Sequence, residues 1–450
     1  MVRVTPRRST LWLALVAFAF FFWLLPGGPQ KFPEAVSVND NHQMFPDTVP
    51  VIGDYQKLLE KFPETVPVNG DYHVLKRRED ERHIWSYQVA NFSLGTPPRS
   101  FEAVLSLQST DIFVPNDGIL LSSVCPDCIG YVPSASGTYR PGKKGGMHRK
   151  ETIDTLTVAG GIQVPNQPFL LDLGFSYDVE EKLPGHQYSG FGLAVGPPRK
   201  THQDKPYRIG EIQTVLSPFR NMIDSKVLDR NMFSLRLARN LTDEGHIMFG
   251  GYDNNQFEGD LVNHPWYMPE TSFWSIEVSS VLMTTTNAEG LKNVLVDESL
   301  AGVQVTLTTG PQIQFPDRFL TKILAALNTT ADDCLSNDCL DCDSDLDKLP
   351  VMSFLIGDQK FDITPSEYVI KYKYPSWHKE RCDPLFGRVY NRGGNSDGDQ
   401  MYLGTPFLDK VYSVYDWDEK TISCKWLFIF KIILLYRKLT QFCSVGKLRE

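Results

Sequence analysis

From about residue 87 onward, short stretches of alternating apolar and polar residues are separated by turns rich in Gly and Pro. Alternation with a period of two places the apolar side chains on one face of a β-strand, and the intervening Gly and Pro end one strand before the next begins. The stretches are 101–107, 152–158, 232–237, 246–249, 274–283, 294–296 and 411–415. The pattern predicts a mostly β protein over residues 87–424.

Two further segments carry apolar residues at intervals of three and four, the spacing of one helix face. They lie about a hundred residues apart, one in each half of the β-rich region, which indicates a duplicated architecture. An apolar stripe of this kind usually packs into a core, so neither is interpreted as a ligand site. The residues are Val215, Phe219, Met222, Ile223 and Val227 in the first segment, and Phe319, Ile323, Leu324 and Leu327 in the second.

The first 28 residues have the features of an export signal. Three arginines precede an unbroken apolar run from Leu11 to Leu25, which ends at Pro26. A basic start followed by a short apolar run is typical of a secretory signal peptide, and the run is shorter than the roughly 20 residues that span a bilayer. We therefore predict a signal peptide at 1–28 and a protein that is secreted or lies in a lysosome or elsewhere in the secretory pathway.

Residues 29–80 contain three degenerate copies of a Phe-Pro motif, at 32–33, 45–46 and 62–63. The copies are unevenly spaced and too short to pack as repeats, so the segment is interpreted as a linker or propeptide. It ends in the basic run Lys76-Arg77-Arg78, which is either a cleavage site for a processing protease or a solvated charge cluster.

Residues 425–450 form a basic, apolar tail of unknown role. The apolar run from Trp426 to Tyr436 is interrupted by Lys431 and is too short to cross a membrane. We expect a terminal strand followed by a frayed basic end, and no membrane segment beyond the signal.

Composition excludes some partners and favours an oxidising compartment. The formal net charge is −9, and both ends of the chain are more basic than its middle, so nucleic acid is excluded as a partner. Eight cysteines are too few for a disulfide-built scaffold but enough for a few bridges around a core. Three glycosylation sequons, at Asn91, Asn240 and Asn328, fit an exported protein.

Several segments occur in the order found in one protease family. They are Leu-Gly-Thr-Pro-Pro-Arg-Ser-Phe at 94–101 leading to Phe-Val-Pro at 113–115, Ser-Gly-Thr-Tyr at 136–139, Gly-Phe-Gly-Leu-Ala at 190–194, 233–235, 247–251, 349–369, Tyr-Leu-Gly-Thr-Pro-Phe-Leu at 402–408, and Val-Tyr-Asp at 414–416. Over residues 87–424 the chain resembles the pepsin-like aspartic proteases. The resemblance implies a mostly β, bilobal fold with a central cleft and a few short helices.

The resemblance also implies a domain organisation and a ligand class. The N-terminal lobe would be 81–262 and the C-terminal lobe 263–424, in a monomer that binds a peptide or protein ligand in its cleft. Cys342 and Cys382 occupy the positions of the family's second-lobe disulfide. Cys334 with Cys339, and Cys125 with Cys128, would form local bridges, although Cys125-Pro126-Asp127-Cys128 is also compatible with a redox or zinc half-site.

Metal ions and cofactors are not expected. Four aspartates at 341, 343, 345 and 347 alternate as in a calcium-binding loop. An EF-hand requires Gly at its sixth position and Glu at its twelfth, where this chain has Leu346 and Met352. The segment is therefore interpreted as a solvated acidic loop.

The family's chemistry makes a demand that this sequence does not meet. Two aspartates, each in an Asp-Thr-Gly loop, share one proton so that one acts as base while the other acts as acid. In the first loop Ser106 replaces the Asp, within Ser106-Leu107-Gln108-Ser109. We assign the second position to Asp297, which is followed by Glu298-Ser299 instead of Thr-Gly. The flap segment after Tyr139 is short and lacks the family's tyrosine.

A lone carboxylate cannot be acid and base in one step, and the neighbouring Glu298 is not expected to rebuild the pair because adjacent side chains point in different directions. The family is one of endopeptidases, but this chain is predicted to be an inactive member that keeps a peptide-binding cleft. One alternative is an active aspartic endopeptidase that hydrolyses proteins at acidic pH. A second is a structural glycoprotein without a cleft ligand.

Overall fold

The computed structural model describes residues 73–427, except for 80–85, 118–128, 146–148, 174–188, 196–215, 241, 258, 268–272, 288, 332–333, 335–338, 344, 374–379 and 390–398. The chain divides into two units, 1–65 and 66–450, and all described residues lie in the second. The signal peptide, the Phe-Pro repeats and most of the tail therefore lie outside the described residues. No helix in the described ranges is long and apolar enough to cross a membrane.

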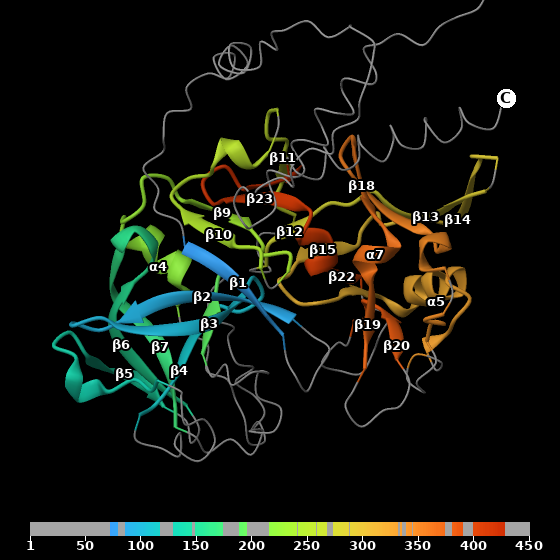
Figure 1. The fold of residues 1–450 in the computed structure, drawn as a ribbon. Coiled ribbons are helices and arrows are strands. Elements are labelled where there is room, and N and C mark those ends of the chain that lie inside the picture. The colour runs from blue at the N-terminus through green and yellow to red at the C-terminus, as the bar shows by residue number, and fades with distance from the viewer. Residues whose placement is uncertain are drawn as a thin grey trace, which may run out of the picture. The chain divides into compact units, whose positions relative to one another are not determined.

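The largest sheet extends through most of the first lobe and takes in strands from the end of the chain (Figure 1). Its thirteen strands follow in the order β11 (Asn263–Pro265), β24 (Thr421–Trp426), β23 (Val411–Asp416), β9 (Met232–Arg236), β10 (Gly245–Phe249), β1 (His73–Glu79), β2 (Ser86–Leu94), β3 (Arg99–Ser106), β8 (Gly190–Gly192), β4 (Ile112–Pro115), β7 (Gln163–Asp172), β6 (Arg149–Thr157) and β5 (Arg140–Gly145).

Three smaller sheets lie between β11 and β23 in the sequence. The five-stranded sheet has the order β12 (Ser275–Ile276), β15 (Gln304–Leu307), β22 (Gln400–Leu403), β16 (Ile313–Phe315) and β21 (Phe386–Arg388). The four-stranded sheet has the order β14 (Lys292–Ser299), β13 (Ser280–Thr286), β17 (Val351–Ile356) and β18 (Gln359–Ile363), and β19 (Val369–Tyr372) pairs with β20 (Arg381–Pro384).

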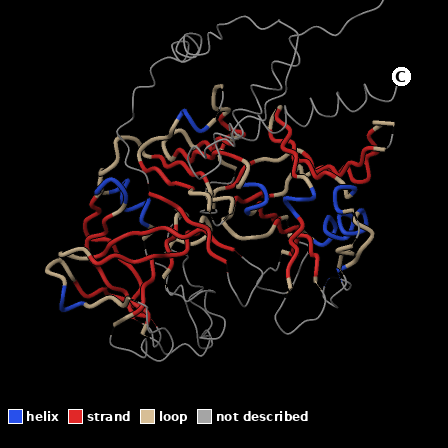
Figure 2. Tube along the Cα trace, viewed as in Figure 1, coloured by secondary structure: helices blue, strands red, loops and turns tan. Residues whose placement is uncertain are grey.

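The α-helices of the described residues are short and few among the strands (Figure 2). They are α4 (Pro218–Asp224), α5 (Asp317–Ala326), α7 (Pro365–Tyr368) and α8 (Thr405–Leu408). The helical spacing in the sequence predicted α4 and α5, and both are confirmed. The Ser217 side chain caps α4 by accepting a hydrogen bond from the Arg220 amide, and α5 buries Phe319 and Ile323.

The core that joins the two lobes is rich in aromatic side chains. Phe233 and Tyr415 stack with ring centroids 4.5 Å apart, and both contact Trp274. The Trp274 indole is fully buried and donates a hydrogen bond to the Leu193 carbonyl at 2.9 Å. Trp274, which belongs to the second lobe, is thus hydrogen-bonded to the residue that directly follows β8 in the first lobe. The predicted mostly β, bilobal fold is confirmed.

Strand β1 lies in the segment that the sequence suggested was linker or propeptide. Its first residues, His73 to Leu75, pair antiparallel with β10, and Leu75 to Glu79 pair antiparallel with β2. The basic run Lys76-Arg77-Arg78 is therefore part of a sheet strand rather than of an extended linker. The pairing with β10, which lies far along the sequence, leaves no trace in the local pattern, which is why the sequence did not predict this strand.

Candidate functional site

The two lobes repeat one arrangement of strands. In the first, β3 runs parallel to β8, which is antiparallel to β4, and a loop at 107–111 joins β3 to β4. In the second, β15 runs parallel to β22, which is antiparallel to β16, and a loop at 308–312 joins β15 to β16. The duplication inferred from the sequence is confirmed in this topology, and the two loops occupy equivalent positions.

Ser106 is the last residue of β3, at the start of the first loop. Its Oγ accepts hydrogen bonds from the backbone amides of Gln108, at 3.2 Å, and Ser109, at 3.1 Å. Its carbonyl accepts a hydrogen bond from the Leu193 amide at 2.8 Å. The hydroxyl therefore closes its own turn and is half-buried.

Thr308 has the same role at the start of the second loop. Its Oγ1 accepts a hydrogen bond from the Gly310 amide at 3.0 Å, two residues ahead, as Ser106 does from Gln108. Its own amide donates to the Leu403 carbonyl at 2.9 Å. Thr308 is buried, with 5% of its surface exposed.

A glycine faces each loop from the neighbouring strand end. At Gly192 a Cβ atom would overlap the carbonyl of Ser109, and at Gly404 a Cβ atom would overlap the carbonyl of Gln312. These matching close approaches require glycine at both positions. They show that both loops lie against a glycine at the end of the neighbouring strand.

The two loops are tied to each other by a side-chain hydrogen bond. The Thr309 Oγ1 donates to the carbonyl of Leu105 at 2.7 Å, and the bond is buried. Leu105 directly precedes Ser106, so this contact places the Thr308 loop beside the Ser106 loop. The residue equivalent to Thr309 in the first loop is Leu107, which has no hydroxyl to return the bond.

The assignment of Asp297 to the second loop is corrected by this geometry. Asp297 lies on β14, where it is exposed and pairs with Leu282 of β13 at the edge of the four-stranded sheet. Its neighbour Glu298 forms an ion pair with Lys322 of α5, with 2.6 Å between Oε1 and Nζ. Ser106 is therefore matched by Thr308, and Asp297 has no part in the paired loops.

The sequence contained a signal for the correct residue. Thr308-Thr309-Gly310 keeps the Thr-Gly of the family's Asp-Thr-Gly, whereas Asp297 matches the family's loop only as an acid that follows an apolar run. That run is the outer strand of a hairpin, and its Val294 and Leu295 are about half exposed. Exposure of this kind cannot be read from an apolar run alone.

The paired loops contain a single acidic side chain. It is Asp111 at the end of the first loop, which is buried and accepts a hydrogen bond from the Thr110 hydroxyl at 3.1 Å, whereas residues 308–312 contain none. An aliphatic hydroxyl does not lose its proton near neutral pH, so neither Ser106 nor Thr308 can act as a general base. The arrangement offers hydrogen-bonding groups and no titratable pair.

The flap segment corresponds to the β5–β6 hairpin. The base of this hairpin is fixed by Asp154, which is 1% exposed and accepts hydrogen bonds from the hydroxyls of Tyr131 and Thr138. Burial, and then the bond to Asp154, raises the pKa of Tyr131. The base of the hairpin is therefore held by hydrogen bonds from the Tyr131 and Thr138 hydroxyls to the buried side chain of Asp154.

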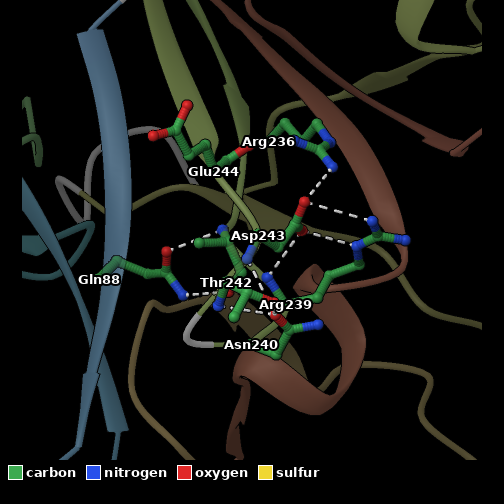
Figure 3. A network of polar contacts seen from close by, with 8 residues as sticks. Gln88, Arg236, Arg239, Asn240, Thr242, Asp243 and Glu244 are labelled. Atoms are coloured by element: carbon green, nitrogen blue, oxygen red, sulfur yellow. Dashed lines mark hydrogen bonds and ion pairs between the residues drawn. The ribbon is translucent and has the colours of Figure 1, made fainter. Parts of the chain in front are cut away.

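All three sequon asparagines are exposed. Asn91 lies on β2, and Asn328 follows α5 with a φ of 56°. Asn240 lies in the β9–β10 turn, where its Oδ1 accepts bonds from the Thr242 amide, at 2.9 Å, and the Thr242 hydroxyl, at 2.8 Å (Figure 3). The side-chain carbonyl of this asparagine is thus fixed by its own sequon threonine.

The same turn holds a partly buried ion-pair network (Figure 3). Asp243 contacts Arg239 at 2.7 Å and Arg236 at 2.9 Å. Burial alone would raise the pKa of Asp243, but hydrogen bonds from Arg239 and the charge of Arg236 outweigh it and lower the pKa to about 2. The Gln88 side chain, from β2, bonds both the carbonyl and the amide of Ala238 and so fastens β2 to this turn.

Two disulfides are present in the described residues. They join Cys342 to Cys382 and Cys334 to Cys339. Cys125 and Cys128 lie outside the described residues, and Cys424 is a buried free thiol whose pKa is raised to about 12 by burial. Within the described ranges, no three His, Cys, Asp or Glu side chains are grouped to hold a metal ion.

Comparison with known proteins agrees with this topology. The family model described as eukaryotic aspartyl protease matches residues 87–425. Gastricsin from Macaca fuscata fuscata is 25% identical over 336 residues, which cover 72% of this chain and 79% of the relative. Renin from Echis ocellatus is 25% identical, with 72% and 76% covered, and vacuolar protease A from Aspergillus fumigatus is 25% identical, with 73% and 75% covered.

Proposed function

The chain belongs to the eukaryotic aspartyl protease family, and from this premise we propose that it is a non-catalytic member that binds peptides without hydrolysing them. The observation that carries the proposal is the pair of hydroxyls, Ser106 and Thr308, at the equivalent starts of the two facing loops. Family members need a carboxylate in each of these places.

The loss of both acids removes both proton transfers of the reaction. Peptide hydrolysis by this family needs one group to take a proton from water and another to give a proton to the peptide carbonyl. Each positioned proton transfer contributes roughly 10²–10⁴-fold to the rate. Two hydroxyls that accept hydrogen bonds from their own loops supply neither transfer, which supports an inactive protein more strongly than the loss of one acid would.

Peptide binding is supported by what the chain has kept. Both loops retain their turns, Gly192 and Gly404 still face them, and Thr309 still ties the second loop to Leu105. Side chains that only shaped a catalytic centre would be free to drift once catalysis had gone. A peptide or protein ligand in the cleft, bound by a monomer, is the use that accounts for paired loops that keep this frame around two hydroxyls.

The compartment is the secretory pathway or outside the cell. The basic and apolar start of the chain, 1–28, acts as a signal peptide in this proposal, and glycans are carried at Asn91, Asn240 and Asn328. The disulfides at Cys334–Cys339 and Cys342–Cys382 support an oxidising compartment. The lobes are 81–262 and 263–424, and β1 joins the first lobe although it precedes residue 81.

The test is proteolysis of an unfolded protein substrate between about pH 2 and pH 7. We expect no turnover by the wild type above a mock preparation. The double variant Ser106→Asp/Thr308→Asp, with both acids restored, is the positive comparison, and Asp297→Ala is the matched control that should behave as the wild type.

Turnover by the wild type that the inhibitor pepstatin stops would establish the alternative, an active aspartic endopeptidase. If Asp297→Ala then lost that turnover, Asp297 would be the catalytic residue despite its position on β14. Failure of the wild type to retain any member of a random peptide library would favour a structural glycoprotein without a cleft ligand.

A further inference from the structure

Four of the eight cysteines meet beside strand β20. Cys334 is bonded to Cys339, and Cys342 is bonded to Cys382 of β20. The two middle cysteines belong to the run Cys-Leu-Asp-Cys at 339–342, so each bridge takes one of its members from this run. Leu340, inside the run, donates its amide to the Cys382 carbonyl at 3.1 Å, which places the run directly against β20.

Cys334 is held at the same strand. The Arg381 guanidinium, from β20, donates a hydrogen bond to the Cys334 carbonyl. Arg381 also pairs with Asp383, with 3.0 Å between Nε and Oδ2, so its charge is largely neutralised. The Thr329 hydroxyl lies 3.9 Å from the Cys334 Sγ. Both bridges are therefore attached to one short stretch of β20.

Solvent reaches the four cysteines unequally. Cys334 and Cys342 are partly exposed, whereas Cys339 is 4% exposed and Cys382 is 0% exposed. A dissolved thiolate must touch a disulfide sulfur in order to attack it, so burial protects the two inner members. The Cys334–Cys339 bridge joins residues 5 apart and the Cys342–Cys382 bridge residues 40 apart, so opening the first frees less of the chain. Cys334 is thus the point of attack that disturbs the fold least.

The charge around Cys334 favours one class of thiol. Residues 331–347 contain no Lys or Arg and seven aspartates, at 332, 333, 338, 341, 343, 345 and 347. Opposite charge raises the local concentration of a small reactant, and like charge lowers it. A cationic thiol is therefore the reactant that this segment attracts.

We propose that Cys334 is a modification site for small cationic thiols and that its modification moves the second bridge to the Cys-Leu-Asp-Cys run. The incoming thiolate bonds to the Cys334 Sγ, the Cys334–Cys339 bond breaks, and Cys339 leaves as a thiolate. Cys339 then attacks Cys342 and forms a bond with it, which breaks the bond to Cys382. The proton of the incoming thiol ends on Cys382. One thiol is consumed and one is released, so the exchange needs no other oxidant or reductant.

The probe is cysteamine, a two-carbon aminothiol, added to the full chain at about 1 mM and about pH 8, where a useful fraction is thiolate. N-ethylmaleimide then blocks free thiols, and mass spectrometry of an unreduced digest maps every cysteine. We expect cysteamine on Cys334, a Cys339–Cys342 bridge and maleimide on Cys382. Cys424, a buried free thiol, should stay unlabelled because the protein remains folded. The anionic thiol 2-mercaptoethanesulfonate, at equal thiolate concentration, should react several-fold more slowly.

Two variants separate the two steps. Cys334→Ser leaves Cys339 without its partner from the start, so the Cys339–Cys342 bridge and a free Cys382 should form with no thiol added. Cys334→Ser/Cys339→Ser is the matched control, which keeps only the second bridge. In cysteamine the control should release Cys382 at least about tenfold more slowly than the wild type, because it lacks the thiolate that attacks from within the chain.

Maleimide on both Cys334 and Cys339 beside an intact Cys342–Cys382 bridge would overturn the inference, since the first bridge would then open without exchange. Equally fast release of Cys382 in the control, or an intact Cys342–Cys382 bridge in Cys334→Ser, would also overturn it. Labelling of Cys424 together with Cys382 would show that unfolding, not exchange, releases the thiol. A reaction with the anionic thiol as fast as with cysteamine would remove the assignment to cationic thiols.

Discussion

Replacing Thr309 with Val should destabilise the protein, because the hydroxyl of Thr309 donates to the Leu105 carbonyl, for which the described part of the chain supplies no other donor. In β3 the neighbours of Leu105 bond toward β8: the Val104 amide donates to Ser189, and the Ser106 carbonyl accepts from Leu193. Alternation along a strand turns the Leu105 carbonyl to the other side, where pairing with β2 has already ended at Val104. The Thr309 hydroxyl fills that gap at 2.7 Å.

The expected loss follows from burial. Leu105 is 1% exposed, so the carbonyl freed by Thr309→Val gains little from water. An unsatisfied buried acceptor costs about 1–3 kcal/mol, which corresponds to a roughly 5- to 150-fold fall in the folding equilibrium constant. Val keeps nearly the shape of Thr, so most of the change reports the hydrogen bond rather than a cavity.

Equilibrium unfolding in urea, followed by tryptophan fluorescence, gives the change in free energy if the slope is unchanged. Thr309→Ser, which keeps the hydroxyl, is the matched control and should lose less than half as much. A Thr309→Val variant within about 0.5 kcal/mol of the wild type, or a Ser variant as unstable as the Val variant, would refute the reasoning.

Three other predictions concern stability. Gly404→Ala should destabilise by several kcal/mol in the same urea assay, because its Cβ would overlap a backbone carbonyl that cannot move freely, and a variant as stable as the wild type would contradict the close approach. Asp243→Asn should cost about 2 kcal/mol at pH 7. Since the pKa of Asp243 is lowered from 3.8 to about 2, its contribution is present above pH 3.8 and fades as the pH falls toward 2, so the deficit of the variant should fade over the same interval. Burial lowers the pKa of His246 from 6.5 to about 4, so the unfolded chain binds a proton that the folded protein does not, and stability should fall as the pH drops from 6.5 to 4. His246→Phe should flatten that part of the pH profile, and an unchanged slope would show that another group is responsible.

The sequence predicted the elements whose signals are local. Alternation at 101–107 became β3, and the apolar spacing around Phe319 became α5, because one buried face is written directly into each pattern. Ser106 was placed correctly at the end of its strand, since the residues around it match the family closely. Local periodicity and a well-matched motif were sufficient for these.

The sequence failed where position depends on distant partners. Asp297 lies after an apolar run that resembled the strand before a catalytic loop, but β14 pairs with β13 as an outer strand. Thr308 has only the following Thr-Gly as a signal in the sequence, and its place is fixed by the parallel pairing of β15 with β22, about a hundred residues later, and by the bond between Thr309 and Leu105. A search for the family's aspartates therefore finds Asp297 and misses Thr308, which has no carboxyl group.

Strand β1 connects two parts of the large sheet by pairing with both. Five strands, from β11 to β10, lie on one side of it and seven, from β2 to β5, on the other, and in the described residues no ladder other than those of β1 connects the two groups. Its partner changes from β10 to β2 at Leu75, immediately before Lys76-Arg77-Arg78. A cut within that basic run would divide β1 just after its partner changes. The fragment before the cut would stay paired with β10, and the fragment after it would stay paired with β2.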